Sequence, residues 1–175
     1  MEEKIFVNKT YIKEREHKAL NKTVFNSKMT PMIIVYQVMA LIFMIYGFIV
    51  KNYFIAITFG VLLVCFPALM ILLSRLRTIK LYNKYKELYA NLIYTFTFYD
   101  NFVKIDLSNG NKQSSGKFNY QDLSVIEDKE NIYLFISATN AYVVSKEGFE
   151  KNYDPLGFRS VVLGKVKKYK IKKRG

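Results

Sequence analysis

Two long runs of apolar residues dominate the first half of the chain. Residues 31–50 and residues 54–73 each form a twenty-residue stretch without a charge, and only residues 51–53 separate them. As an α-helix rising 1.5 Å per residue, each run is about 30 Å long, which matches the hydrocarbon core of a bilayer. The alternative is a buried hairpin of a soluble protein, but a chain of 175 residues cannot cover two helices that are apolar on every side. The pattern therefore predicts a transmembrane helical hairpin over residues 31–73.

The segments that flank this hairpin carry weaker periodic patterns. Residues 1–30 are expected to be a separate N-terminal segment, with a short strand at residues 5–7, then a helix in which His17 lies at the surface. In residues 74–91 apolar positions recur every three to four residues among Lys and Arg. This spacing predicts a basic amphipathic stalk helix that continues out of the membrane.

From residue 92 the period of the pattern changes to two. Apolar and polar residues alternate in short runs, and Asn109-Gly110 is a typical two-residue hairpin turn. Asp154 followed by Pro155 predicts the start of a helix. Residues 92–164 are therefore expected to form an α+β domain, a small antiparallel β-meander or open barrel with a C-terminal helix, similar to a pleckstrin-homology-like (PH-like) module. The predicted strands are residues 94–99, 103–107, 115–120, 123–127, 132–137 and 142–145.

The positive charge lies outside this predicted domain. The chain has 27 Lys and Arg against 14 Asp and Glu, a net charge of +13. Residues 92–164 hold seven basic and nine acidic residues, whereas the tail, residues 165–175, holds seven basic residues and no acidic one. A nucleic-acid partner is not expected, because the folded domain itself is slightly acidic.

Basic residues beside a bilayer attract anionic headgroups with about 1 kcal/mol each. The alternatives are that those of the stalk only set the membrane topology and that the tail is solvated and disordered. The candidate lipid-binding residues are Arg75, Arg77, Lys80 and Lys84 in the stalk, and Lys165, Lys167, Lys168, Lys170, Lys172, Lys173 and Arg174 in the tail.

The orientation follows from the basic residues near the ends of the two runs. Several Lys and Arg precede the first run and follow the second, and only Lys51 lies between them. By the positive-inside rule both termini are cytoplasmic, and the protein is a two-span protein of the cell membrane. A cleaved signal peptide is not expected, because the first apolar run starts only after thirty residues that include four glutamates.

Small and polar residues inside the hairpin suggest how its helices pack. Ala56, Gly60 and Ala68 recur at multiples of four residues, a spacing that lets another helix approach closely and that could support a homo-oligomer. Gln37 is the one amide within the two runs, and an interhelical hydrogen bond is favoured over a transport path.

The residue types offer little for catalysis. One Cys and one His exclude a disulfide within the chain and a zinc site built from several such ligands. The sequence also lacks a phosphate-binding glycine loop and a nucleophile motif. The acidic residues are expected at turns and on exposed strand faces, so neither an enzyme nor a cofactor is predicted; they are Asp100, Asp106, Asp122, Glu127 and Asp128.

Three stretches of the chain resemble a known family. YTFTFYDNFVKI (residues 94–105), FNYQDLSVIEDKENIYLFIS (118–137) and AYVVSKEGF (141–149) are similar to the YcxB-like family of small bacterial membrane proteins. The resemblance covers roughly residues 30–150 and departs from the family at Asn101-Phe102 and in the basic tail. It implies a two-span hairpin with a PH-like cytoplasmic domain, and the family carries no established activity. The residues that match are Tyr120, Asp122, Tyr133, Tyr142, Lys146 and Phe149.

Two functions are compatible with these features. The first is a membrane-anchored, non-catalytic module whose cytoplasmic domain docks a protein partner or an anionic lipid headgroup. The second is a hairpin that oligomerises in the membrane and acts as a transporter accessory or as an immunity protein against a membrane-active toxin.

Overall fold

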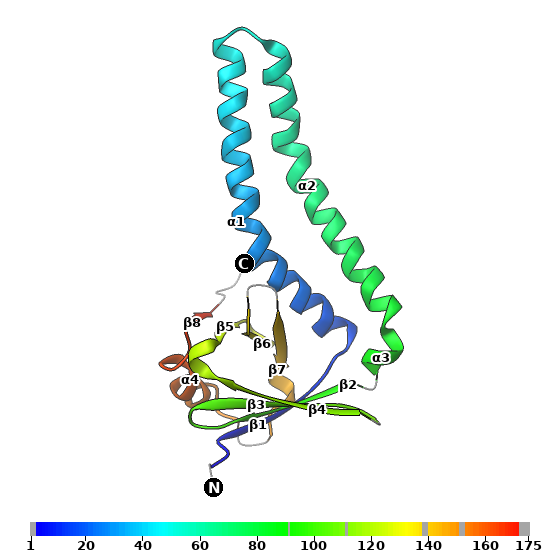
Figure 1. Ribbon diagram of the computed structural model, residues 1–175, viewed down its shortest axis with the longest axis vertical. Coiled ribbons are helices and arrows are strands. Elements are labelled where there is room, and N and C mark those ends of the chain that lie inside the picture. Colours follow the sequence, from blue (N-terminus) through cyan, green and yellow to red (C-terminus); the bar gives the residue numbers. More distant parts are fainter. Residues whose placement is uncertain (1–2, 91, 111, 138–139, 151–152, 172–175) are drawn as a thin grey trace. The chain divides into compact units, whose positions relative to one another are not determined.

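The computed structural model describes residues 3–90, 92–110, 112–137, 140–150 and 153–171. The chain divides into two compact units (Figure 1). One, here called the sheet unit, consists of Met1–Val24 and Tyr82–Gly175, and the other, the hairpin unit, consists of Phe25–Leu81. The hairpin unit is thus inserted between two stretches of chain that fold together.

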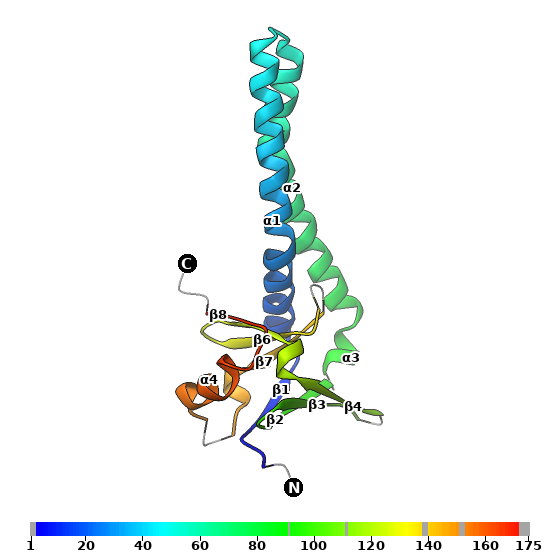
Figure 2. The same ribbon diagram turned by 60° about the vertical axis from the view of Figure 1, so that its left-hand side comes forward.

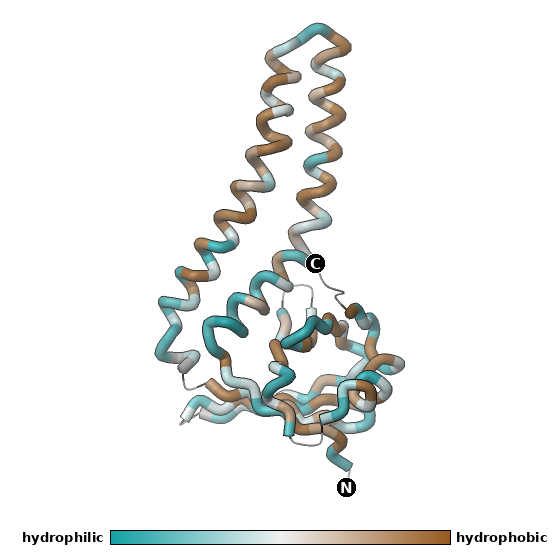
Figure 3. Tube along the Cα trace, turned by 180° about the vertical axis from the view of Figure 1, so that it is seen from behind, coloured by the Kyte–Doolittle hydropathy of each residue, from teal (hydrophilic) through white to brown (hydrophobic). Residues whose placement is uncertain are grey.

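Two long helices supply the hairpin unit. Helix α1 spans Glu14–Ile49 and α2 spans Tyr53–Lys84, so both predicted helices are confirmed. Over Met29–Ile49 and Tyr53–Lys84 they are long and apolar enough to cross a membrane, by length and composition. Figure 3 shows their traces mostly in the colour of hydrophobic residues.

Small side chains bring the two helices together near the turn that joins them. A Cβ atom on Gly47 would lie 2.6 Å from the backbone nitrogen of Ala56, so only glycine permits this approach. Ala56 is buried at 2% exposure. Farther from the turn, stacked rings fill the space between the helices, with Phe43 and Phe59 at 4.9 Å between centroids. The helices therefore diverge away from the turn (Figure 1).

The predicted stalk is not one continuous helix. Helix α2 carries on to Lys84, and the five-residue helix α3, Lys86–Ala90, follows after a break at Tyr85. The break lies within the sheet unit, where Tyr82 and Tyr89 stack at 5.9 Å between ring centroids.

The sheet unit contains two four-stranded sheets with the orders β1-β2-β3-β4 and β7-β6-β5-β8. The six predicted strands are confirmed as β2 to β7. The strands of the first sheet are β1 Phe6–Tyr11, β2 Leu92–Phe98, β3 Phe102–Asn109 and β4 Lys112–Asn119. Those of the second are β5 Ser124–Glu127, β6 Asn131–Phe135, β7 Ala141–Ser145 and β8 Lys168–Ile171.

Both ends of the chain join these sheets, which the sequence pattern did not indicate. The predicted strand near the N-terminus is confirmed as β1, but it pairs antiparallel with β2, from Phe6 opposite Phe98 to Tyr11 opposite Ile93. Residues 168–171 of the tail form β8, which pairs parallel with β5. For these four residues the structure excludes the alternative of a solvated, disordered tail, because they form an edge strand whose Tyr169 packs on the core and bonds to Glu127.

The C-terminal helix α4, Pro155–Leu163, begins as predicted. The Asp154 side chain accepts hydrogen bonds from the backbone N–H groups of Leu156 at 3.0 Å and Gly157 at 2.8 Å, and Pro155 takes the first helical position. Phe158 and Val162 are fully buried in the main core with Phe96 and Val144 from the two sheets. Figure 2 shows α4 beside the strands.

The first turns of α1 belong to the sheet unit as well. Ala19, Leu20 and Val24 pack on a second core cluster that includes Tyr133 and Phe135 of β6. The chain therefore enters and leaves the hairpin unit from segments that are buried in the same folded unit.

Candidate functional site

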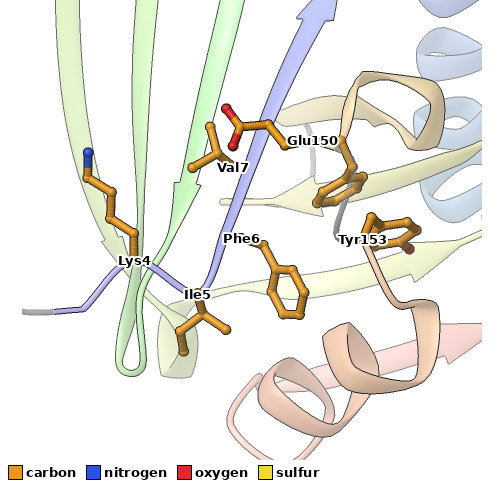
Figure 4. A pocket seen from close by; sticks show the side chains of 7 residues that line it. Lys4, Ile5, Phe6, Val7, Glu150 and Tyr153 are labelled. Carbon is orange, nitrogen blue, oxygen red and sulfur yellow. The ribbon is translucent and has the colours of Figure 1, made fainter.

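A pocket of about 500 Å³ lies at the edge of β1 in the sheet unit. Its walls come from both ends of the sequence, because β1 precedes the hairpin and the other wall follows β7. Figure 4 shows the side chains around it. They are Lys4, Ile5, Phe6, Val7, Phe149, Glu150 and Tyr153.

Close backbone contacts position the second wall against β1. The Glu150 N–H donates to the Val7 carbonyl at 3.2 Å, and Asn8 forms an antiparallel bridge with Phe149. A Cβ atom on Gly148 would clash with the Lys9 carbonyl oxygen, so this approach requires glycine. Backbone contacts between β1 and residues 148–150 therefore fix the two walls of the pocket relative to each other.

Aromatic rings form the floor of the pocket. Phe149 and Tyr153 stack at 4.0 Å between centroids, and the Phe6 ring meets Phe158 edge-on at 5.7 Å. Burial raises the pKa of Tyr153 to about 12, so its hydroxyl is neutral at pH 7. That hydroxyl is buried and finds no hydrogen-bond partner among the described residues.

The charged residues of the pocket, Lys4 and Glu150, are exposed. The lining residues thus offer apolar contact from the rings and one charge of each sign. This arrangement can hold a small group with an apolar body.

Elsewhere in the sheet unit a buried carboxylate on β5 links three other segments of the chain. Glu127 on β5 is 1% exposed, which contradicts the expectation that it lies on an exposed strand face. Its carboxylate accepts two bonds from the Arg159 guanidinium of α4, at 2.9 and 3.0 Å, and one from the Lys146 ammonium at 2.6 Å. The Tyr169 hydroxyl of β8 also donates to it, at 2.5 Å.

These donors decide the ionisation of Glu127. Burial alone would raise the pKa of the carboxyl, but the hydrogen bonds from Arg159, Lys146 and Tyr169 outweigh burial and lower the pKa to about 2. The Glu127 carboxylate is therefore ionised and accepts hydrogen bonds from all three of these residues. These bonds hold α4 and β8 on the sheet. One signal for this was present in the sequence, because Glu127 shares a strand face with Val125, which is in the core.

The tail residues are divided between fixed and exposed positions. The Lys165 ammonium pairs with the Asp100 carboxylate and carbonyl, and the Lys167 N–H donates to the Leu123 carbonyl at 2.9 Å. The side chains of Lys167, Lys168 and Lys170 are exposed. Lys172, Lys173 and Arg174 lie outside the described residues.

The predicted stalk residues occupy helix α2. Arg75, Arg77 and Lys80 are exposed and belong to the hairpin unit, where they follow the apolar stretch of the helix. Lys84 belongs to the sheet unit, and its ammonium lies 5.5 Å from the centroid of the Tyr85 ring. The structure therefore provides three exposed cations near the C-terminal end of α2.

The predicted small-residue stripe does not lie on one free surface. Ala56 is covered by Gly47 of the same chain, and a Cβ atom on Gly60 would lie 3.6 Å from the Met44 sulfur. Ala68 is exposed. The first two residues thus pack the hairpin against itself, and Gly47, which sequence reasoning missed, is the residue that permits it.

His17 is buried, contrary to the expected surface position. Its exposed fraction is 8%, and its ring lies 5.1 Å from the Tyr89 ring and 5.5 Å from the Tyr82 ring. This cluster joins the two segments of the sheet unit that flank the hairpin. Within the part of the chain that the structure describes, no group of three or more His, Cys, Asp or Glu side chains could hold a metal ion.

Comparisons with protein-family models, with curated proteins and with solved structures find no match to the chain.

Proposed function

We propose that the protein is a membrane-anchored, non-catalytic binding module that docks on anionic lipid headgroups at the inner leaflet of the cell membrane. The hairpin crosses the bilayer twice, and both termini and the sheet unit are cytoplasmic. One observation carries this proposal. Apolar side chains are exposed along both helices over membrane-spanning lengths, for instance Ile49 at 74% and Phe54 at 80%.

The exposure of these side chains supports a bilayer as their solvent. Soluble proteins rarely expose apolar patches of more than a few hundred Å², because each Å² left in water costs about 25 cal/mol. In a bilayer the exposure of the same side chains costs no free energy, because the surrounding lipid is apolar. The intact helices also satisfy the hydrogen bonds of their own backbone groups. The single lysine in the turn, against the many basic residues at the other ends, supports the cytoplasmic orientation of the termini.

The element order of the sheet unit supports a PH-like module of the YcxB-like type. Strands β1 to β7 pair antiparallel within two sheets, and α4 follows them and contributes to the core, before β8 adds to the second sheet parallel to β5. Several residues that carry the family resemblance stabilise the fold through hydrogen bonds. The Tyr120 hydroxyl donates to the Tyr99 carbonyl, the Tyr133 hydroxyl to the Asp128 carboxylate, and the Lys146 ammonium to the Glu127 carboxylate. These residues therefore stabilise the fold, and they do not identify a ligand.

Exposed cations beside the apolar surface favour an anionic lipid as that ligand. Arg75, Arg77 and Lys80 follow directly on the apolar stretch of α2 and are exposed. In an inserted hairpin, residues at this distance from the apolar stretch lie at the headgroup level, where each cation gains about 1 kcal/mol from an anionic surface. A Debye length of about 8 Å at physiological salt makes this attraction sensitive to ionic strength.

The experiment measures lipid selectivity around the full-length chain in mixed vesicles. Spin-labelled phosphatidylglycerol and phosphatidylcholine report the relative association of each lipid with the protein. We expect a preference of several-fold for phosphatidylglycerol at low salt, which falls toward one at high salt and in the triple variant Arg75→Gln, Arg77→Gln, Lys80→Gln.

A charge-preserving variant provides the control. Arg75→Lys with Arg77→Lys should keep the preference, because the attraction depends on charge and not on the guanidinium geometry. If the wild-type chain shows no preference, or if the triple variant keeps it, headgroup binding is wrong. Cross-linking in cells would then test a protein partner, with the pocket beside β1 as its expected docking place.

A further inference from the structure

A groove of about 530 Å³ runs between α1 and α2 within the hairpin unit. The groove exists because Gly47 and Ala56 hold the helices close at one end, while the ring pairs Tyr36–Phe66 and Phe43–Phe59 hold them apart beyond it. Apolar side chains supply nearly all of its lining. The lining residues are Val35, Tyr36, Gln37, Met39, Ala40, Phe43, Phe59, Leu62, Leu63 and Phe66.

Gln37 is the exception in this lining. Its amide carries two donors and an acceptor, and the only other polar side-chain group among the lining residues is the Tyr36 hydroxyl. In hydrocarbon an amide without partners is costly, so it selects an occupant of the groove that can hydrogen-bond. A lipid acyl chain fills apolar space but offers the amide no partner.

We propose that a second copy of this chain occupies the groove, and that the two Gln37 amides hydrogen-bond to each other in a parallel dimer of hairpins. This inference rests on the membrane insertion in the proposed function. All copies of a protein with one orientation carry Gln37 at the same depth, so the two amides meet without any shift along the membrane normal. The carboxamide is also its own complement, since its partially negative oxygen faces the partially positive amino group of the other copy.

Both features agree with a two-fold interface, in which the same patch is used on each copy. A different membrane protein would need a polar residue at this one depth, whereas a second copy supplies it automatically. The groove is a different surface from the small-residue stripe, because Ala56 is already covered by Gly47.

The experiment uses the full-length chain with Cys65→Ala, labelled with donor or acceptor dyes at Lys51→Cys and reconstituted in phosphatidylcholine vesicles. Energy transfer is followed as the protein is diluted with lipid. We expect a dimer whose affinity falls about tenfold in Gln37→Leu, because two interhelical hydrogen bonds are lost. Thr58→Val is the matched control, since the Thr58 hydroxyl already bonds to the Phe54 carbonyl of its own helix at 2.8 Å.

Disulfide formation gives a second readout of the same interface. In the Cys65→Ala background, Ala40→Cys should cross-link between copies in the membrane. Ile57→Cys lies outside the groove lining and should cross-link much less.

A chain that stays monomeric at every dilution, or a Gln37→Leu variant that dimerises as tightly as the parent, would overturn the proposal. Extraction of the vesicles at alkaline pH separates this failure from that of the proposed function. A chain that resists extraction but is monomeric contradicts only the dimer, whereas a chain that is extracted contradicts the insertion itself.

Discussion

The two units of this protein use the same kinds of side chain in opposite ways. In the sheet unit Phe96, Phe98 and Phe158 are fully buried, whereas Phe54 in the hairpin unit is 80% exposed. The sheet unit thus removes its apolar surface from water by folding on itself. The hairpin unit leaves that surface open, and only an apolar solvent or another helix can cover it.

Polar groups follow the same contrast. The sheet unit buries a carboxylate, Glu127, and supplies it with cations from two other segments and a hydroxyl from a third. The groove of the hairpin unit contains one amide, that of Gln37. The only other polar side-chain group among its lining residues is the Tyr36 hydroxyl. At Glu127 the sheet unit therefore satisfies a buried charge internally, whereas the hairpin unit leaves the Gln37 amide for an external partner.

The largest effect that separates the two units comes from removing a ring. Phe158→Ala in the core should lower the free energy of unfolding of the sheet unit by about 4 kcal/mol, because a large buried ring is lost and a cavity remains. Phe54→Ala, the matched change in the hairpin unit, should lower the free energy of unfolding by less than about 0.5 kcal/mol, because this ring is exposed. Urea unfolding of the full-length chain in detergent, followed by the near-ultraviolet circular dichroism of the tyrosines, measures both. Equal effects would remove the distinction between the units.

Removal of the buried charge should come next in size. Glu127→Gln leaves Arg159 and Lys146 without their shared anion, and we expect a loss of about 3 kcal/mol in the same unfolding measurement. Glu130→Gln is the control, because Glu130 is exposed in the turn before β6 and its loss should change stability little. A loss below about 1 kcal/mol for Glu127→Gln would show that the carboxylate does not hold α4 and β8.

Acid should reproduce this loss without a mutation. The pKa of Glu127 is lowered from 4.5 to about 2 in the folded chain, so its contribution is complete above about pH 4.5 and disappears as the pH falls to about 2. At 1.36 kcal/mol per pKa unit, the wild type should lose about 3 kcal/mol more than Glu127→Gln between these pH values. Parallel pH curves for the two proteins would contradict the lowered pKa.

The smallest effect concerns the docked tail. Tyr169→Phe removes the hydroxyl that bonds to Glu127 but keeps the ring in the core, so the sheet unit should lose about 1 kcal/mol. Amide hydrogen exchange of residues 168–171 should become faster in this variant, because β8 is held less tightly. Unchanged exchange would mean that backbone pairing with β5 alone fixes the strand.

The contrast between the units also explains what could be predicted from the sequence. Local signals were sufficient for the long helices, for the strands β2 to β7 and for the Asp154 cap of α4, because each depends on residues close together in the chain. The pairing of β1 with β2 joins residues on both sides of the hairpin, and the pairing of β8 with β5 joins the tail to the middle of the domain. No local period encodes such partners.

The same reason accounts for the sites that sequence reasoning missed. The sequence places Glu127 beside a polar turn, which indicates a surface residue. Its partners Lys146, Arg159 and Tyr169 come from later segments, so only the fold shows that it is buried. The pocket needs Phe6 from one end of the chain and Tyr153 from the other. The close approach at Gly47 depends on the register of two helices, which composition alone does not specify.

The central claim is that the hairpin crosses the membrane with the sheet unit on the cytoplasmic side, and single cysteines test it most directly. In the Cys65→Ala background, Lys51→Cys marks the turn and Ser114→Cys marks an exposed position on β4. Intact cells are treated with a membrane-impermeant maleimide, before and after permeabilisation. The account predicts labelling of the turn cysteine in intact cells and of the β4 cysteine only after permeabilisation. Labelling of the β4 cysteine in intact cells, or protection of the turn cysteine, would contradict it.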